Sequence, residues 1–147
     1  MSFQADPNRV MWRLHLRSSP ETVYHLLSSD EGRSRFWAES AIETNGQIDF
    51  KFPDGQMWRG KILDAEAARL FRVEYLGGST TTFLLEPDGE GGTDLTLIDE
   101  GVPAPDHLEV VAGWVSVLMT LKAAADFGVD LRNHDPNRTW ADGYVEN

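Results

Sequence analysis

The side chains able to do acid–base or metal chemistry are few and scattered along the chain. The four histidines, His15, His25, His107 and His134, never stand three or four positions apart, so their spacing does not build a metal site on one helix face. The sequence has no cysteine, which excludes disulfides, thiolate zinc sites and thiol nucleophiles. It also lacks a phosphate-binding loop, a dinucleotide fingerprint and a nucleophile elbow. We therefore expect no metal and no cofactor, and we assign no catalytic residue.

Two neighbouring carboxylates are the best candidates for a polar group inside an apolar pocket. Asp99 and Glu100 lead from a predicted strand into the loop before a long helix. If either one points inward, we expect it to lie beside Arg59 or His107 and to orient a ligand. The alternative is that both carboxylates are solvated in a surface loop. His107 stands at the start of the helix, where its cationic form is disfavoured, and an acid–base pair of His107 and Glu100 stays open.

The composition is that of an ordinary globular domain, and its charge excludes several partners. The chain has 147 residues, of which 41% are hydrophobic and 25% charged, with a net charge of -11. Such an acidic chain without a Lys/Arg cluster repels nucleic acid and anionic membrane surfaces. The first ten residues include Asp6 and Arg9 and lack the apolar core of a secretion signal. We expect a cytoplasmic protein.

The elements that must position these residues can be predicted from hydrophobic periodicity. Residues 10–17 alternate apolar and polar side chains, which predicts a strand with one buried face. Ser19 and Pro20 supply a helix cap and a first helical position, and a second short helix is predicted over 30–37, entered through Ser29.

Between residues 41 and 99 the period is two, with turn signals at short intervals. Asn45-Gly46 is typical of a type I′ hairpin, and Pro53-Asp54-Gly55 predicts the next turn. About six strands follow one another in this region. Because such short turns join antiparallel neighbours, we predict an antiparallel sheet in an α+β fold.

A long apolar helix is predicted within residues 107–130. Lys122 and Asp126 would be costly at membrane depth, so we do not expect it to span a bilayer. A helical wheel places Trp114 at the centre of the apolar face and Glu109, Ser116 and Thr120 on a wet opposite side. Gly113 lies at the edge of the apolar face, where we expect another element to approach closely.

Aromatic residues on the predicted strands are candidates to line the space beside this helix. They are Phe50, Trp58, Tyr75 and Phe83, together with Trp114 of the helix itself. Periodicity alone leaves two interpretations open, because aromatic rings also fill dry cores. They form either a filled core or the lining of a ligand cavity.

Several short motifs, taken in order, resemble one known superfamily. The motifs are Ser19-Pro20-Glu21, Phe36-Trp37, DGQMWRG at 54–60, GGTDLTLIDEG at 91–101 and Gly113-Trp114 with Leu118 and Leu121 following. This pattern resembles the START-related SRPBCC superfamily, and within it the bacterial homologues of the activator of the heat-shock protein 90 ATPase. The resemblance covers roughly residues 10–131. The sequence departs from the family at Asn45-Gly46, where a double glycine is usual, and in its polar tail.

The resemblance implies a helix-grip fold, in which a curved antiparallel sheet, two short helices and a long C-terminal helix enclose a hydrophobic cavity. We predict a single domain over residues 1–147 with a polar tail over 132–147, which packs and can bring Trp140 or Tyr144 across the cavity mouth. The predicted ligand-binding residues are Trp37, Phe50, Trp58, Tyr75, Phe83, His107, Trp114 and Leu118.

Three functions follow from the resemblance. The first is binding of a small apolar, aromatic or amphipathic molecule without catalysis. The second is a protein-interaction module that contacts a chaperone, which would need an exposed apolar or charge-complementary surface. The third is a cyclase- or hydrolase-like enzyme that uses the same cavity. We expect the first, with a homodimer left open, and neither nucleic acid nor membrane insertion.

Overall fold

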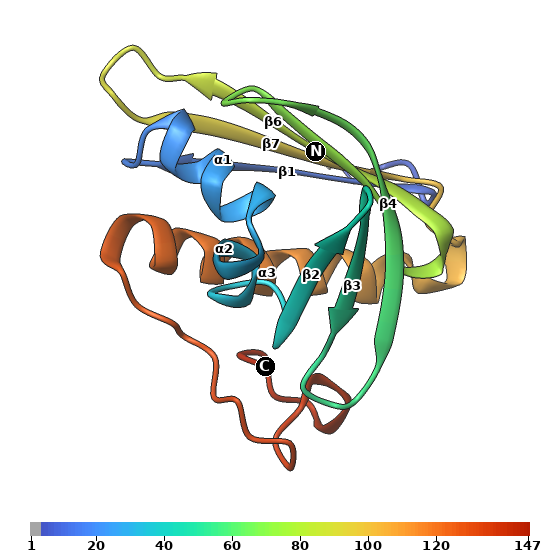
Figure 1. The fold of residues 1–147 in the computed structure, drawn as a ribbon. Coiled ribbons are helices and arrows are strands. Elements are labelled where there is room, and N and C mark those ends of the chain that lie inside the picture. The colour runs from blue at the N-terminus through green and yellow to red at the C-terminus, as the bar shows by residue number, and fades with distance from the viewer. Residues whose placement is uncertain (1–3) are drawn as a thin grey trace.

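The computed structural model describes residues 4–147, and within them the chain forms one seven-stranded antiparallel sheet and three α-helices (Figure 1). The elements are β1 (Arg9–Leu16), α1 (Pro20–Ser28), α2 (Asp30–Ser34), β2 (Ser40–Thr44), β3 (Gln47–Lys51), β4 (Met57–Glu66), β5 (Leu70–Tyr75), β6 (Ser79–Pro87), β7 (Thr93–Glu100) and α3 (His107–Phe127). The strand order is β1-β7-β6-β5-β4-β3-β2. The predicted α+β helix-grip fold is therefore confirmed.

The two short helices begin where the sequence predicts. The Ser19 hydroxyl accepts a hydrogen bond from the Thr22 amide, and Pro20 is the first residue of α1. Ser29 caps α2 in the same way. The predicted end of α2 at residue 37 is wrong, because α2 stops at Ser34 and the next residues turn. This turn carries Trp37 into the core, where only 4% of its surface is exposed.

The sheet bends along β4. Asn45 and Gly46 both have positive φ, at 52° and 78°, so the predicted hairpin turn joins β2 and β3. A Cβ atom on Gly60 would lie 2.0 Å from the Glu74 carbonyl oxygen, so only glycine allows this approach. The pairing of β4 with β5 also shifts register after Ile62. Together these features turn β2 and β3 away from the rest of the sheet (Figure 1).

Helix α3 crosses the concave side of the sheet and presents three different faces (Figure 1). Its sheet-facing side buries Trp114, Leu118 and Leu121. Its outer side carries Leu108, Val115 and Met119, which are exposed. Its third side faces the C-terminal tail, which follows the helix back along the molecule.

The predicted wet side of α3 is wrong in part, because the tail covers it. The Thr120 side chain is buried, with 4% of its surface exposed. Ser116 donates a hydrogen bond to the Val145 carbonyl, and the Trp140 indole donates to Glu109 at 3.1 Å. A polar tail therefore packs on polar helix residues that a helical wheel assigns to solvent.

Both halves of α3 are fixed to the edge strand β1 and the segment after it. The Trp12 indole donates to the Val111 carbonyl at 3.1 Å, and the Asp126 carboxylate accepts from the Arg17 and Ser18 amides at 3.0 Å. Burial alone would raise the pKa of Asp126, but these bonds, the Ser18 hydroxyl and Lys122 lower it to about 2. By length and composition α3 could cross a membrane. Its Trp114, Leu118 and Leu121 side chains pack into the core of the domain.

Candidate functional site

An aromatic cluster fills the space between the sheet and α3, with Trp37 at its centre. The Trp37 ring centroid lies 5.0 Å from that of Phe50, 5.4 Å from Phe83, 5.5 Å from Tyr75 and 6.2 Å from Trp114. Phe50 and Phe83 are fully buried. Such tilted and edge-on ring pairs are typical of packed cores. This part of the space is therefore a filled core.

A cavity of about 450 Å³ lies beside the cluster, on the side of the tail. The rings of Trp37, Tyr75 and Trp114 form its inner wall, and Trp140 belongs to its outer wall. The loop between β3 and β4, the segment after β5, the end of β7 with the loop that follows it, and the tail-facing side of α3 also contribute to the lining. Ligand pockets in proteins commonly have volumes of about 300–1,000 Å³. The space is therefore large enough for a small organic molecule.

Asp99 is the most deeply buried carboxylate of this cavity, with 2% of its surface exposed. It accepts hydrogen bonds from the Thr81 hydroxyl and from the Trp114 indole, both at 2.9 Å. Burial raises the pKa of Asp99, and the bonds from Trp114, Ser79 and Thr81 lower it only in part. All of these donors are neutral, so the carboxyl group sits in the cavity wall without a cationic partner among residues 4–147.

The predicted surroundings of the two carboxylates are wrong. Both residues belong to β7 rather than to a loop, and because side chains alternate along a strand, Asp99 points inward whereas Glu100 is exposed. Arg59 lies on the outside of the sheet, where it pairs with Asp49 at 2.7 Å. The His107 ring is held by the backbone carbonyl of Arg9 at 3.0 Å. Neither Arg59 nor His107 is a neighbour of the buried carboxyl group.

A second polar group of the cavity wall is the hydroxyl of Tyr75. The Trp37 indole donates to this oxygen at 3.0 Å, and both residues are buried. Burial raises the pKa of Tyr75 above its ordinary value, so the phenol stays neutral at physiological pH. Since its oxygen acts as an acceptor toward Trp37, its O–H remains a donor for a further partner.

Of the eight predicted ligand-binding residues, the cavity lining includes Trp37, Tyr75 and Trp114. Phe50, Phe83 and Leu118 lie in the core behind this wall. Trp58 is half-buried on β4, where its indole donates to the Glu74 carbonyl at 3.2 Å, and His107 lies at the start of α3. The ligand-binding role of the eight residues stays a prediction.

No other element approaches Gly113 closely, so the close approach predicted from the sequence is wrong. A Cβ atom placed on Gly113 would meet no atom within 4 Å, and the residue belongs to the cavity lining. The missing side chain therefore keeps part of the cavity open at the middle of α3.

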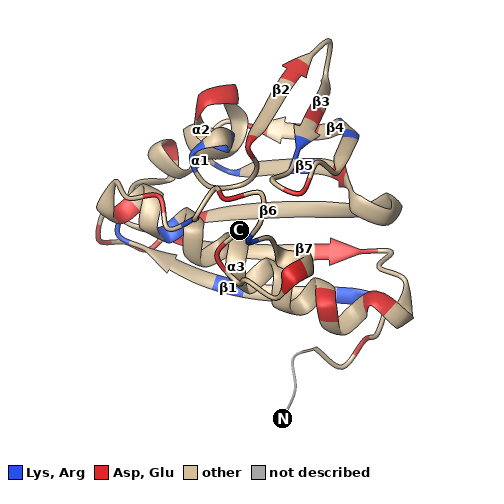
Figure 2. Ribbon diagram, turned by 90° about the horizontal axis from the view of Figure 1, so that it is seen from below, with Lys and Arg blue, Asp and Glu red and all other residues tan. Residues whose placement is uncertain are grey.

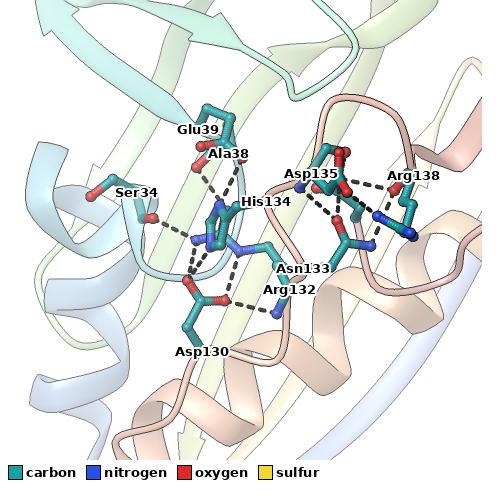
Figure 3. Close-up of polar contacts among 10 residues, drawn as sticks. Ser34, Ala38, Glu39, Asp130, Arg132, Asn133, His134, Asp135 and Arg138 are labelled. Atoms are coloured by element: carbon teal, nitrogen blue, oxygen red, sulfur yellow. Dashed lines mark hydrogen bonds and ion pairs between the residues drawn. The ribbon is translucent and has the colours of Figure 1, made fainter.

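The tail that forms the outer wall is tied to the loop after α2 by a group of charged residues, which we call the Arg132 clasp (Figure 3). Arg132 donates to the Ser34 and Ala38 carbonyls at 2.6 and 2.8 Å and pairs with Asp130 at 3.0 Å. His134 lies between Asp130 at 2.7 Å and Glu39 at 2.8 Å.

The clasp changes the acidity of its own members. Burial alone would raise the pKa of Asp130, but hydrogen bonds from Arg132 and His134 lower it to about 2. Burial alone would lower the pKa of His134, but its bonds to Asp130 and Glu39 raise it. Within the same tail, Asn133, Asp135 and Arg138 form a second polar group (Figure 3). These contacts hold the tail as a packed segment, as the sequence predicts.

Several lining residues were missed from the sequence. They are Phe36, Phe52, Gly113, Thr120, Arg132 and Thr139, whereas Asp99 as a polar group of the pocket and Trp140 at its mouth were among the expectations. The inward direction of Asp99 could also have been predicted, because Leu95, Leu97 and Asp99 alternate on one face of β7 and both leucines are apolar. The tail residues carry no periodic signal that indicates which surface they cover.

The comparisons with known proteins now add to this geometry. Residues 17–126 match the family model described as activator of Hsp90 ATPase homolog 1-like protein, which is most of the chain. The chain belongs to this family. No curated protein matches it.

Solved structures of other members of this fold are similar over most of the chain. A protein of Staphylococcus saprophyticus has a TM-score of 0.73 at 22% identity, over 84% of this chain and 96% of its own. The Aha1 dimer of Colwellia psychrerythraea has a TM-score of 0.73 at 20% identity, over 82% and 97%. DynU16, a putative protein in the dynemicin biosynthetic locus, has a TM-score of 0.70 at 20% identity, over 84% and 49%. The match to the family model ends at residue 126, so the tail of this chain lies outside the matched region.

Proposed function

We propose that the protein binds a small hydrophobic or aromatic molecule in the cavity between the aromatic cluster, α3 and the tail. The observation that carries this proposal is a 450 Å³ cavity with tryptophan and tyrosine rings on one wall and the buried Asp99 in it. An apolar lining with a few convergent polar groups is the common character of small-molecule sites. The Tyr75 hydroxyl and the Asp99 carboxyl are two buried polar groups of this lining, whereas Asp54, Asp106 and Glu109 are exposed. We further propose that this takes place in the cytoplasm.

The test combines a search for a co-purified ligand with titration of a neutral probe. Native mass spectrometry of the purified protein is expected to detect a bound small molecule that dissociates on activation. Isothermal titration with 4-phenylbutan-1-ol is expected to give saturable binding. The variant Gly113→Leu places a side chain in the cavity and is expected to abolish that binding, because no atom lies within 4 Å of its Cβ position.

The matched control is Ala112→Leu, which adds the same side chain to the exposed outer side of α3. This control is expected to bind the probe like the wild-type protein. Equal binding to the wild type and to both variants would locate the probe elsewhere and refute the proposal. So would the absence of any bound molecule and of any probe binding.

A second candidate function is contact with a protein partner through the outer side of α3. Leu108 is 81% exposed, and Val115 and Met119 on the same side are 42% and 48% exposed. Exposed apolar rows of this kind are typical of interaction surfaces. The family name points to a chaperone, and the Colwellia relative to a second copy of the chain.

The variant Met119→Glu separates this second candidate from the first. It is expected to abolish binding to heat-shock protein 90 or self-association in sedimentation, and to leave probe binding unchanged. If the wild-type protein neither sediments as a dimer nor changes the ATPase rate of heat-shock protein 90, this candidate is excluded.

A further inference from the structure

The charges around the cavity are almost all negative. Its lining contains the carboxylates of Asp54, Asp99, Asp106 and Glu109, and Arg132 is its cationic side chain. More generally, α3 and the tail carry more acidic than basic residues, as Figure 2 shows from the side on which they lie. A cavity lined by one sign of charge attracts ligands of the other sign.

The one guanidinium of the lining is already engaged. Arg132 donates to the Ser34 and Ala38 carbonyls and to the Asp130 carboxylate, so its charge is balanced inside the clasp. By contrast, none of the four lining carboxylates has a Lys, Arg or His nitrogen within 4.0 Å among residues 4–147. The negative charge of the cavity is therefore not neutralised by the described part of the chain.

Asp99 is the deepest of these carboxylates and retains capacity for a further bond. An ionised carboxylate offers about four acceptor positions. The Thr81 hydroxyl and the Trp114 indole use two of them. An ionised carboxylate buried without a counter-ion is costly. A cationic ligand would supply both a further hydrogen bond and the missing charge.

The aromatic wall places tyrosine and tryptophan rings next to this carboxylate. The faces of tryptophan and tyrosine rings attract cations that lie within about 6 Å of the ring centre. The Tyr75 and Trp114 ring centroids are 5.3 Å apart, and the Trp114 indole donates directly to Asp99. A cation bound to this carboxylate would therefore lie beside aromatic rings.

We propose that the cavity selects a cationic amphiphile, an amine or quaternary ammonium compound with an aryl or alkyl body. Its ammonium group pairs with Asp99 beside Tyr75 and Trp114, and its apolar body occupies the space toward Trp140. This inference rests on the proposed function and adds the charge of the ligand to it.

The test uses three probes that share one body and differ in charge. They are 4-phenylbutylamine, 4-phenylbutan-1-ol and 4-phenylbutanoate, which at pH 7 are a cation, a neutral molecule and an anion. Isothermal titration of the wild-type protein is expected to give a Kd for the amine at least tenfold lower than for the alcohol. The carboxylate is expected to bind more weakly than the alcohol.

Two variants show which group makes the difference. In Asp99→Asn the preference for the amine over the alcohol is expected to disappear, while the Kd for the alcohol stays within twofold. Glu86→Gln removes one negative charge from an exposed site on β6, outside the cavity lining, and is expected to keep the preference. The control therefore separates a local pairing from the overall charge of the protein.

The outcomes distinguish this inference from the function on which it rests. Equal binding of the amine and the alcohol to the wild-type protein would overturn the cationic preference and leave a cavity that binds neutral ligands. A preference that survives in Asp99→Asn would overturn the role of this carboxylate. Failure of all three probes would refute the proposed function itself. The comparison of probes on the wild-type protein needs no variant, so it decides the matter even if Asp99→Asn does not fold.

Discussion

Replacing Gly113 by alanine is expected to stabilise the protein, although glycine in this family motif precedes a buried tryptophan. The position lies inside α3, where glycine costs about 1 kcal/mol relative to alanine. An added Cβ meets no atom within 4 Å, so no clash offsets this gain. The expected increase in the free energy of unfolding is therefore about 0.5–1 kcal/mol. For a chain of this length, that raises the melting temperature by about 2–3 °C.

The assay is urea unfolding followed by circular dichroism, with calorimetry for the melting temperature. Ala112→Gly serves as the matched control, because it makes the opposite change one residue away on the exposed side of α3. It is expected to destabilise the protein by a similar amount. The reasoning is refuted if Gly113→Ala lowers the free energy of unfolding, since that would mean that the space beside this glycine is occupied.

The leucine variant at the same position links stability to binding. Leucine has a helix propensity close to that of alanine, and its side chain would bury apolar surface against the cavity wall, which is stabilising. We expect Gly113→Leu to be at least as stable as the wild-type protein. Loss of probe binding in a variant of undiminished stability would then report on the cavity rather than on unfolding.

Two further predictions concern the sheet and the clasp. Gly60→Ala is expected to destabilise the protein by about 1–3 kcal/mol in urea unfolding, because its Cβ would lie 2.0 Å from the Glu74 carbonyl; unchanged stability would contradict the bend. His134 has a raised pKa, so its pairing with Asp130 and Glu39 stabilises fully below the ordinary histidine pKa of about 6.5 and is lost as pH rises through the folded-state pKa. The stability difference between wild type and His134→Asn should therefore be larger at pH 5.5 than at pH 9, and equal differences would argue against the pairing.

The fold was predictable because its signals are local. The alternation of strand residues sets which face of each strand is buried, and Asn45-Gly46 can adopt the two positive φ angles of a type I′ turn. Ser19 and Ser29 cap their helices by accepting a hydrogen bond from the backbone amide three residues later, an arrangement that the residue type and its position before the helix already indicate.

The site was less predictable because it depends on contacts between distant parts of the chain. Helix α3 has three environments, and a helical wheel distinguishes only an apolar side from a polar side. Thr120 is polar and buried because residues of the tail cover it, and no local pattern encodes that cover. The inward direction of Asp99 could be read from the alternation along β7. Its hydrogen bonds to Thr81 and Trp114 could not.

The positions of the five tryptophans allow ligand binding to be followed by intrinsic fluorescence. Trp37, Trp114 and Trp140 line the cavity, whereas Trp12 and Trp58 donate to backbone carbonyls elsewhere. A molecule that enters the cavity therefore changes the surroundings of three indoles and leaves two as an internal reference. The intrinsic fluorescence of the unlabelled protein, with emission maximum and quenching by iodide as readouts, is thus a built-in optical reporter of occupancy.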